Sequence, residues 1–307
     1  MNTDAVISEK SRKKIRLSPA DKIYYGVAYT IVTLLTLLVL LPMINILACS
    51  FSAPSAVATG KVVLWPVDWS LTGYEKVFAT NEIWIGYGNT LFYTVVGTLV
   101  NVAVTLMCAY PLARRDLPGK SFFSFLFAFT MLFSGGLVPS YLLARDLHLL
   151  NTRWALIIPG AMAVYQMIIT RTFLVANIPQ DLIEMSQIDG CGDIRFFFSF
   201  VLPLSKAVIA VVAMQYAVGH WNSWFQAFVY LTDDKKYPLQ MMLRRILVMN
   251  QVKATEYLDD ETMIAMEGIA DLLKYALIVV ATVPILCVYP FIQKYFVKGI
   301  MIGSLKG

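Results

Sequence analysis

Residues 178–204, IPQDLIEMSQIDGCGDIRFFFSFVLPL, place a polar segment inside an otherwise apolar chain. Its carboxylates are Asp181, Glu184, Asp189 and Asp193. Pro179 suits the first turn of a short helix, and Gly190 can end that helix. Gly190 and Gly192 together allow a sharp reversal into the phenylalanine-rich run. We therefore predict a helix–turn–helix protrusion here.

The composition is that of a membrane protein. Hydrophobic residues make up 58% of the chain and charged residues 15%, whereas soluble domains average about 45–50% and about 25%. A helix of about 20 apolar residues crosses a hydrocarbon core of roughly 30 Å, and unpaired backbone groups are not tolerated in lipid. We therefore predict an all-α integral membrane protein with six transmembrane helices. The predicted spans are 24–50, 86–113, 121–144, 154–176, 201–231 and 272–296.

Basic residues predict the orientation, because Lys and Arg near membrane segments favour the cytoplasmic side. With the N-terminus inside, most of them fall on that side. These are Lys10, Arg12, Lys13, Lys14, Arg16, Lys22, Arg114, Arg115, Lys120, Arg171, Arg195, Lys206, Lys294, Lys298 and Lys306. The shorter loops of the opposite side hold Lys61, Lys76, Arg145 and Arg153. We expect both termini in the cytoplasm.

This topology divides the chain into a cytoplasmic tail at 1–23, a membrane domain at 24–297 and a second cytoplasmic tail at 298–307. The polar loop 177–203 then lies in the cytoplasm between the fourth and fifth helices. The loop 232–271 lies outside, and Leu239, Met242 and Ile246 at helical spacing predict a short amphipathic helix within it.

Nothing in the chain resembles a catalytic or metal centre. The two histidines, His148 and His220, are far apart in sequence, and the four cysteines are too widely spaced for a disulfide or zinc framework. No nucleophile has a candidate base. The net charge of +5 is concentrated beside membrane ends, which argues against nucleic-acid binding. We expect no catalytic residue, metal ligand or cofactor in this chain.

Transport remains as the expected function. The six spans contain no Asp or Glu, although an ion-coupled carrier usually places an ionisable group within the bilayer. Two matching halves with broken helices are also missing. The energy source is therefore expected on another subunit. An ion-coupled secondary transporter acting as a single polypeptide is the alternative, and a membrane enzyme or scaffold is the third possibility.

The polar loop resembles the EAA loop of type I ABC importer permeases of the carbohydrate, maltose-permease-like branch. That loop reads Glu-Ala-Ala, three residues, Gly, nine residues, Ile, one residue, Leu-Pro. The matching positions here are Glu184, Met185, Ser186, Gly190, Phe200, Leu202 and Pro203. Met185 and Ser186 replace the alanines and Phe200 replaces the isoleucine. Asp189 completes the "DG" pair of the sugar-transporting branch.

The resemblance extends along the chain, through GNTLFYTVVGTLVNVAVTLMCAYPLAR at 88–114, GGLVPSYLL at 135–143 and KGIMIGSLKG at 298–307. It implies a type I importer permease of the bacterial inner membrane that translocates an oligosaccharide. It also implies an ATPase homodimer that binds ATP and Mg²⁺, a second and different permease chain, and an extracytoplasmic solute-binding protein. The residues that it assigns to ATPase coupling are Glu184, Met185, Ser186, Asp189, Gly190 and Gly192.

Aromatic and amide side chains suggest where a sugar passes, because indoles stack on sugar rings and amides bind hydroxyls. The stretch GHWNSWFQAF contains Trp221, Asn222 and Trp224, and Tyr165 and Gln166 lie midway along the fourth span. An interfacial aromatic belt explains the tryptophans equally well. The 232–271 loop is expected either to pack on the bundle or to contact the solute-binding protein. Its Arg244–Arg245 pair suits an acidic sugar or simply solvent.

Overall fold

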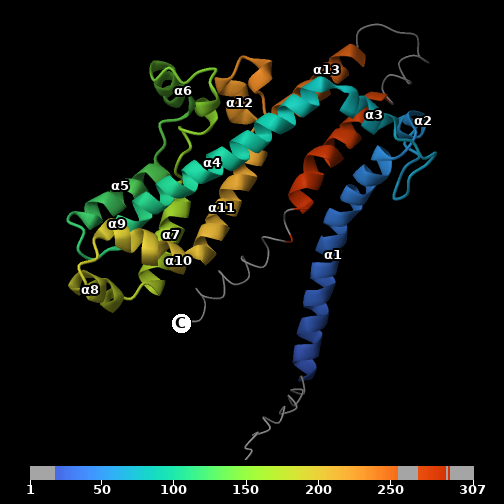
Figure 1. Ribbon diagram of the computed structural model, residues 1–307. Helices are drawn as coiled ribbons and strands as arrows, with labels where there is room; N and C mark the ends of the chain where they lie inside the picture. The colour runs from blue at the N-terminus through green and yellow to red at the C-terminus, as the bar shows by residue number, and fades with distance from the viewer. Residues whose placement is uncertain (1–17, 255–268, 288–289, 291–307) are drawn as a thin grey trace, which may run out of the picture.

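The computed structural model describes residues 18–254, 269–287 and 290, which form helices joined by loops and turns without a β-strand (Figure 1). The elements in chain order are α1 Pro19–Ser50, α2 Pro54–Ala58, α3 Thr72–Ala79, α4 Asn81–Ala113, α5 Lys120–Leu132, α6 Leu137–Asp146, η1 Arg153–Leu156, α7 Val164–Asn177, α8 Gln180–Ile188, α9 Asp193–Phe196, the π-helical η2 Phe197–Val201, α10 Leu202–Leu204, α11 Lys206–Trp221, α12 Phe225–Tyr230, η3 Asp234–Lys236 and α13 Leu239–Ala254. A further helix follows at Ile269–Cys287.

The predicted all-α membrane architecture is confirmed. Among the described residues, α1, α4 and the Ile269–Cys287 helix are each long and apolar enough to cross a membrane. Two bent helix pairs are also long and apolar enough to cross a membrane when each pair is taken as one span. Residues 1–17 of the predicted tail at 1–23, residues 255–268 of the 232–271 loop and the whole predicted tail at 298–307 lie outside the described residues.

Two predicted spans are bent rather than continuous. In the third, α5 and α6 meet at 114° across a break that contains Gly135 and Gly136. Gly136 has a φ of 85°, a conformation that side-chain-bearing residues rarely adopt. In the fifth, helix Asp193–Leu204 meets α11 at 80°. That span also begins earlier than 201–231, and its regular helix ends at Trp221.

The fourth predicted span, 154–176, is only partly helical. It opens with η1, passes through Pro159 and Gly160, and becomes α-helical in α7, which has 14 residues. Non-helical backbone at membrane depth needs hydrogen-bond partners from its neighbours. Asn101 Nδ2 donates to the Gly160 carbonyl at 2.8 Å, and the Ala163 amide donates to the Tyr216 hydroxyl at 3.0 Å. Side chains of α4 and α11 therefore permit this interruption.

Polar residues of α4 hold the end of the bundle next to η3 and α13 in the same way. Asn89 Nδ2 donates to the Lys235 carbonyl at 2.7 Å, and the Tyr93 hydroxyl donates to the Lys236 carbonyl at 2.8 Å. The Leu239 amide, at the start of α13, donates to the Thr90 hydroxyl at 2.8 Å. One face of α4 thus fixes η3 and the first turn of α13.

The expected amphipathic helix in the outer loop is present as α13. Leu239 and Met242 are fully buried, and Ile246 packs partly buried beside the cluster of α3, α4 and the Ile269–Cys287 helix. Figure 1 places α13 at one end of α4 and α8 at the other. The chain thus connects two distant polar regions through one long helix.

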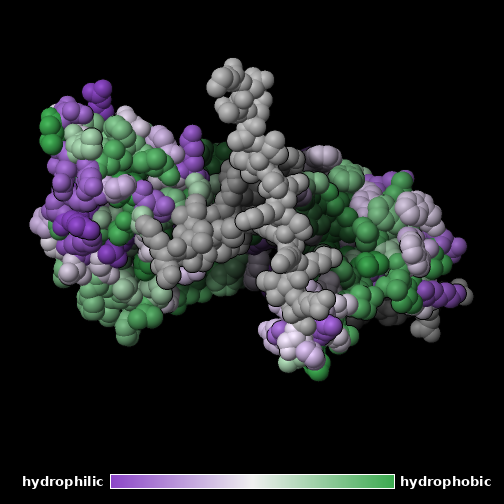
Figure 2. Space-filling model, turned by 90° about the horizontal axis from the view of Figure 1, so that it is seen from below, coloured by the Kyte–Doolittle hydropathy of each residue, from purple (hydrophilic) through white to green (hydrophobic). Residues whose placement is uncertain are grey.

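The surface supports a lipid environment. In α1 the only buried residues are Ala48, Cys49 and Ser50, so nearly the whole apolar helix is exposed. Figure 2 shows hydrophobic side chains over much of the surface, with hydrophilic ones gathered at the left edge, the end that carries α8 in Figure 1. Exposed apolar areas of this extent are typical of surfaces that contact lipid or another subunit.

Gly97 of α4 is required for close packing against α11. A Cβ built there would lie 2.5 Å from His220 Nε2, whose ring is held by Asn101 at 3.3 Å. We predict that Gly97→Ala destabilises the protein by about 1–3 kcal/mol through overpacking. Gly88→Ala on the same helix is the control, because nothing lies within 4 Å of its Cβ. Thermal unfolding in detergent measures both, and an equal melting temperature would contradict this packing.

Candidate functional site

The helix predicted within the 177–203 loop is α8, and both of its ends follow from the sequence. Pro179 occupies the N-cap position with φ −60° and ψ 142°, which its ring favours. At the other end the Gly190 amide donates to the Gln187 carbonyl at 3.0 Å, and the Cys191 amide donates to the Ser186 carbonyl at 2.9 Å. These bonds close the last turn as the chain reverses.

The two glycines of the turn are not equivalent. Gly190 has a φ of 74°, in the left-handed region, which accounts for a glycine at this position. Gly192 has φ −68° and ψ 158°, which any residue adopts, and nothing lies within 4 Å of its Cβ position. The reversal therefore depends on the left-handed backbone of Gly190, whereas the backbone of Gly192 places no such demand on the residue.

One face of α8 is buried and the other is exposed. Ile183 and Ser186 are buried, and the Ser186 hydroxyl donates to the Ile183 carbonyl at 2.7 Å. Ser186 therefore lies beneath the helix, away from solvent. Glu184 and Asp189 are exposed, Met185 is 64% exposed, and Ile188 is 85% exposed. Two large apolar side chains three residues apart thus face outward beside carboxylates.

Apolar packing attaches α8 to the membrane helices. Ile183 belongs to a buried cluster with Leu112 of α4, Leu174 of α7 and Phe196 of α9. Phe196 and Phe200 stack with ring centroids 5.2 Å apart. Phe200, which stands where the family has isoleucine, therefore supports the buried ring. The cluster joins α8 to the ends of α4 and α7.

An ion-pair network around Arg114 adds a second attachment. Arg114 caps the C-terminus of α4, and its Nη1 donates to Asp193 Oδ1 of α9 at 2.8 Å. Its Nε donates to Asp116 Oδ1 at 2.8 Å, and Nη1 also donates to the Tyr110 hydroxyl at 3.2 Å. One guanidinium thus fixes the end of α4 to the start of α9.

The hydrogen bond from Arg114 lowers the pKa of Asp116 to about 2. A carboxyl group whose pKa is depressed in the folded state stabilises that state above its ordinary pKa near 3.8. The contribution disappears as the pH falls through about 2, so this pair stays ionised at neutral pH. The same bond raises the pKa of Arg114.

The tryptophans expected along the sugar pathway occupy different environments. Trp221 Nε1 donates to the Ala281 carbonyl at 3.1 Å, so its polar group is used in helix packing. Asn222 is exposed, and its Nδ2 donates to the Val218 carbonyl at 3.0 Å. Trp224 lies under Arg244, with the guanidinium carbon 3.7 Å from the ring centroid.

Tyr165 and Gln166 lie on α7, in a separate part of the fold. Tyr165 is exposed. Gln166 Nε2 donates to Gln215 Oε1 of α11 at 3.2 Å, and the buried Gln166 Oε1 has no hydrogen-bond partner among the described residues. Gln166 therefore contacts α11 at Gln215, whereas Trp221 and Trp224 both lie near Ala281.

Sequence reasoning missed several residues of the α8 region. Ile188 and Ile194 are more exposed than Met185, and the spacing of Ile188 three residues after Met185 was a signal for a shared face. The Arg114–Asp193 pair joins residues 79 apart in sequence, and no local pattern indicates it. Within the described residues, no group of three or more His, Cys, Asp or Glu side chains could hold a metal ion.

Comparisons with known proteins bear on this fold and site. No protein-family model matches the chain. The polygalacturonan/rhamnogalacturonan transport system permease protein YtcP of Bacillus subtilis (strain 168) is 40% identical over 287 residues, covering 94% of this chain and 99% of YtcP. Protein LplC of the same organism is 43% identical over 268 residues, covering 87% and 90%. The chain belongs to the family of carbohydrate ABC transporter permeases.

A solved structure supports the same family. It is a bacterial ABC transporter involved in the import of the acidic polysaccharide alginate, with a TM-score of 0.80 and 32% identity, covering 92% of this chain and 99% of that one. The predicted importer permease fold is confirmed. This permease is therefore a multi-pass membrane subunit of a saccharide importer, not an enzyme, and works with ATPase and substrate-binding partners.

The left-handed turn after α8 makes a testable difference between its glycines. We predict that Gly190→Ala destabilises the folded permease by roughly 1–2 kcal/mol, the cost of a left-handed conformation with a Cβ. Gly192→Ala should leave stability unchanged, because its backbone and surroundings accept a methyl group. Thermal unfolding of both variants in detergent measures the difference. Equal effects would contradict the assigned turn.

Proposed function

We propose that α8 is the coupling helix through which ATPase subunits drive this permease. The exposed Met185 and Ile188 beside Glu184 and Asp189 carry this proposal, because apolar side chains so exposed on a polar protrusion suit a protein partner. The match to the EAA spacing supports the same role. Gly190 shapes the turn, Gly192 lies exposed beside it, and the buried Ser186 supports the helix from beneath without facing the partner.

The attachment of α8 suits transmission of a rigid-body movement. A displacement of α8 pushes on the Ile183 cluster and thus on the ends of α4 and α7. The Arg114–Asp193 pair keeps α9 with α4 during that displacement. The exposed contact surface and the membrane helices then move together.

The proposed topology has both termini in the cytoplasm, with α8 inside and α13 outside. The division into a tail at 1–23, a membrane domain at 24–297 and a tail at 298–307 belongs to this proposal. The functional unit pairs this chain with a second, different permease and with an ATPase homodimer that binds ATP and Mg²⁺. The 232–271 loop faces the solute-binding protein. The exposed length of α1 supports a large partner surface within the membrane.

Reversing one charge on α8 tests the coupling role. We predict that Glu184→Arg weakens co-purification of the ATPase at least tenfold and abolishes substrate-stimulated ATP hydrolysis, because a contact charge is replaced by its opposite. Asp146→Arg makes the same charge change on α6, which shares a buried cluster with Tyr93 of α4, away from α8. That control should retain both activities. Coupling retained in Glu184→Arg would overturn the assignment.

We infer further that the saccharide is acidic. YtcP and the alginate importer are named for uronate-containing polysaccharides. Arg244 stacks on Trp224 at the edge of a cavity of about 250 Å³ that Gln240 and Thr282 also line. A guanidinium held over an indole keeps its edge N–H groups available to a carboxylate, while the indole supports a sugar ring.

An Arg244→Gln substitution tests this inference. We predict that the KM for uptake of an oligogalacturonide rises roughly tenfold, since a hydrogen bond to a charged group contributes about 1.5–3 kcal/mol. Arg245→Gln is the neighbouring control, because Arg245 pairs with Asp234 instead. Uptake is measured in proteoliposomes that contain the complete importer. An unchanged KM in Arg244→Gln would contradict a carboxylate contact there.

A further inference from the structure

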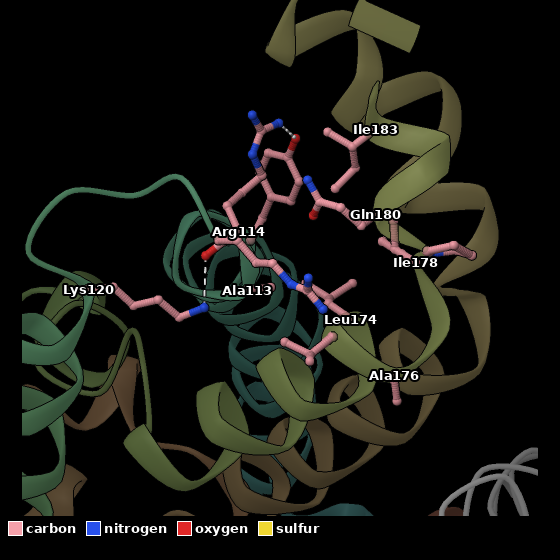
Figure 3. A pocket seen from close by; sticks show the side chains of 12 residues that line it. Ala113, Arg114, Lys120, Leu174, Ala176, Ile178, Gln180 and Ile183 are labelled. Carbon is pink, nitrogen blue, oxygen red and sulfur yellow. Dashed lines mark hydrogen bonds between the residues drawn. The ribbon is translucent and has the colours of Figure 1, made fainter. Parts of the chain in front are cut away.

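A basic cavity of about 330 Å³ lies between α8 and the ends of α4 and α7 (Figure 3). Its volume is within the range of ligand pockets, roughly 300–1,000 Å³. Figure 3 shows Lys120 and Gln180 approaching it from opposite sides, with Arg114 between them. None of the 12 lining residues is Asp or Glu. The full lining is Tyr110, Ala113, Arg114, Arg115, Lys120, Leu174, Val175, Ala176, Ile178, Pro179, Gln180 and Ile183.

The charges at this cavity are unbalanced. Asp116 and Asp193 pair with Arg114 and line a separate cavity. Arg115 and Lys120 remain in the basic cavity. Arg171 lies near enough for its charge to repel that of Lys120, as does Arg115. Arg115 and Lys120 therefore line a wall that has no carboxylate, and Arg171 adds a third positive charge close to Lys120.

Carbonyl groups at the end of α4 accept only some of the hydrogen bonds that Lys120 and Arg171 can donate. Lys120 Nζ donates to the Arg114 carbonyl at 2.8 Å, and Arg171 Nε donates to the Leu112 carbonyl at 3.0 Å. An ammonium has three N–H donors and a guanidinium five. Helix capping thus explains the positions of Lys120 and Arg171 but leaves most of their donors for another acceptor.

We propose that this cavity binds a phosphate group, supplied by the headgroup of an anionic phospholipid in the cytoplasmic leaflet. Basic pockets between transmembrane helices on the cytoplasmic side suit such headgroups. The lining joins Arg115 and Lys120 to the apolar side chains of Leu174, Val175 and Ile178, which suits a molecule with a charged head and apolar chains. The cytoplasmic location rests on the proposed orientation.

A bound phosphate would join elements that move with ATPase coupling. Lys120 opens α5, Arg115 follows α4, and Gln180 opens α8. One anion that contacts all three would reduce the repulsion among the cations and hold α8 against the membrane helices. The lipid would therefore stabilise the position from which the coupling helix works.

The test uses the complete importer in nanodiscs of phosphatidylcholine, with or without phosphatidylglycerol, and native mass spectrometry of the lipid retained after delipidation. We expect the wild type to retain phosphatidylglycerol, and Arg115→Gln to retain it roughly tenfold less. Lys206→Gln removes an exposed charge outside the cavity and should bind as the wild type does. Lys120→Arg keeps the charge and should also retain the lipid.

A second arm separates the sources of phosphate. Inorganic phosphate is added at millimolar concentration to phosphatidylcholine nanodiscs, and thermal stability is measured for the wild type and Arg115→Gln. Stabilisation of the wild type alone would support the phosphate site but assign it to a soluble anion. Equal lipid retention by the wild type and Arg115→Gln, with no phosphate effect, would overturn the proposal.

The ATPase provides a third outcome. If the cavity binds lipid only in the isolated permease and loses it when the ATPase docks, the lipid is absent from the assembled importer and the lipid assignment is wrong. Co-purification of the wild-type complex separates this result from failure of the proposed function. An ATPase that binds normally, with no role for Arg115 in lipid retention, contradicts the cavity proposal alone.

Discussion

Backbone hydrogen bonding without water is the constraint on which this fold depends. A continuous helix satisfies its own backbone, whereas a break at membrane depth needs partners from neighbouring elements. Here α4 supplies many of them: Asn101 binds the Gly160 carbonyl beside η1 and α7, and Asn89 binds the Lys235 carbonyl before α13. The polar residues of an otherwise apolar helix are therefore structural. They allow the surrounding segments to bend and reverse while their backbone groups stay paired.

The same helix organises the two ends of the molecule differently. At the end next to α13, neutral side chains such as Tyr93 and Thr90 bind backbone groups of η3 and α13. At the other end, Arg114 makes ion pairs with Asp116 and Asp193, and apolar side chains complete the attachment of α8. Neutral hydrogen bonds fix the outer loop in register. The ion pairs of Arg114 lie beyond the last turn of α4, where water and headgroups reduce the cost of burial.

Hydropathy predicted which segments lie in the membrane, but not where their helices break. Average apolarity over a window hardly changes at Gly135 and Gly136 or at Pro159 and Gly160, although these pairs are recognised breakers. Gly190 was predictable because the expected helix ends at a glycine, and a glycine readily adopts the left-handed backbone that is found there. The stack of Arg244 on Trp224 was not, since residues far apart in sequence meet only after the outer loop folds back. Local patterns thus predicted elements, and long-range contacts determined the sites.

In the proposed coupling role, the packing of α8 favours α4 and α7 over α11 as the first helices to move when an ATPase subunit displaces α8. Ile183 shares its buried cluster with both of those helices. The route to α11 instead passes through the π-helical η2 and an 80° bend before Lys206. The Ser205 amide still donates to the Val201 carbonyl at 3.0 Å across that bend, so backbone pairing is kept while the axis changes direction. A bend that keeps its hydrogen bonds changes angle at lower cost than a buried cluster changes its packing. Movement of α8 would thus be passed directly to α4 and α7, whereas the bend would redirect the movement that reaches α11. Helices α4 and α11, which meet at Gly97 and His220, would then shift relative to each other.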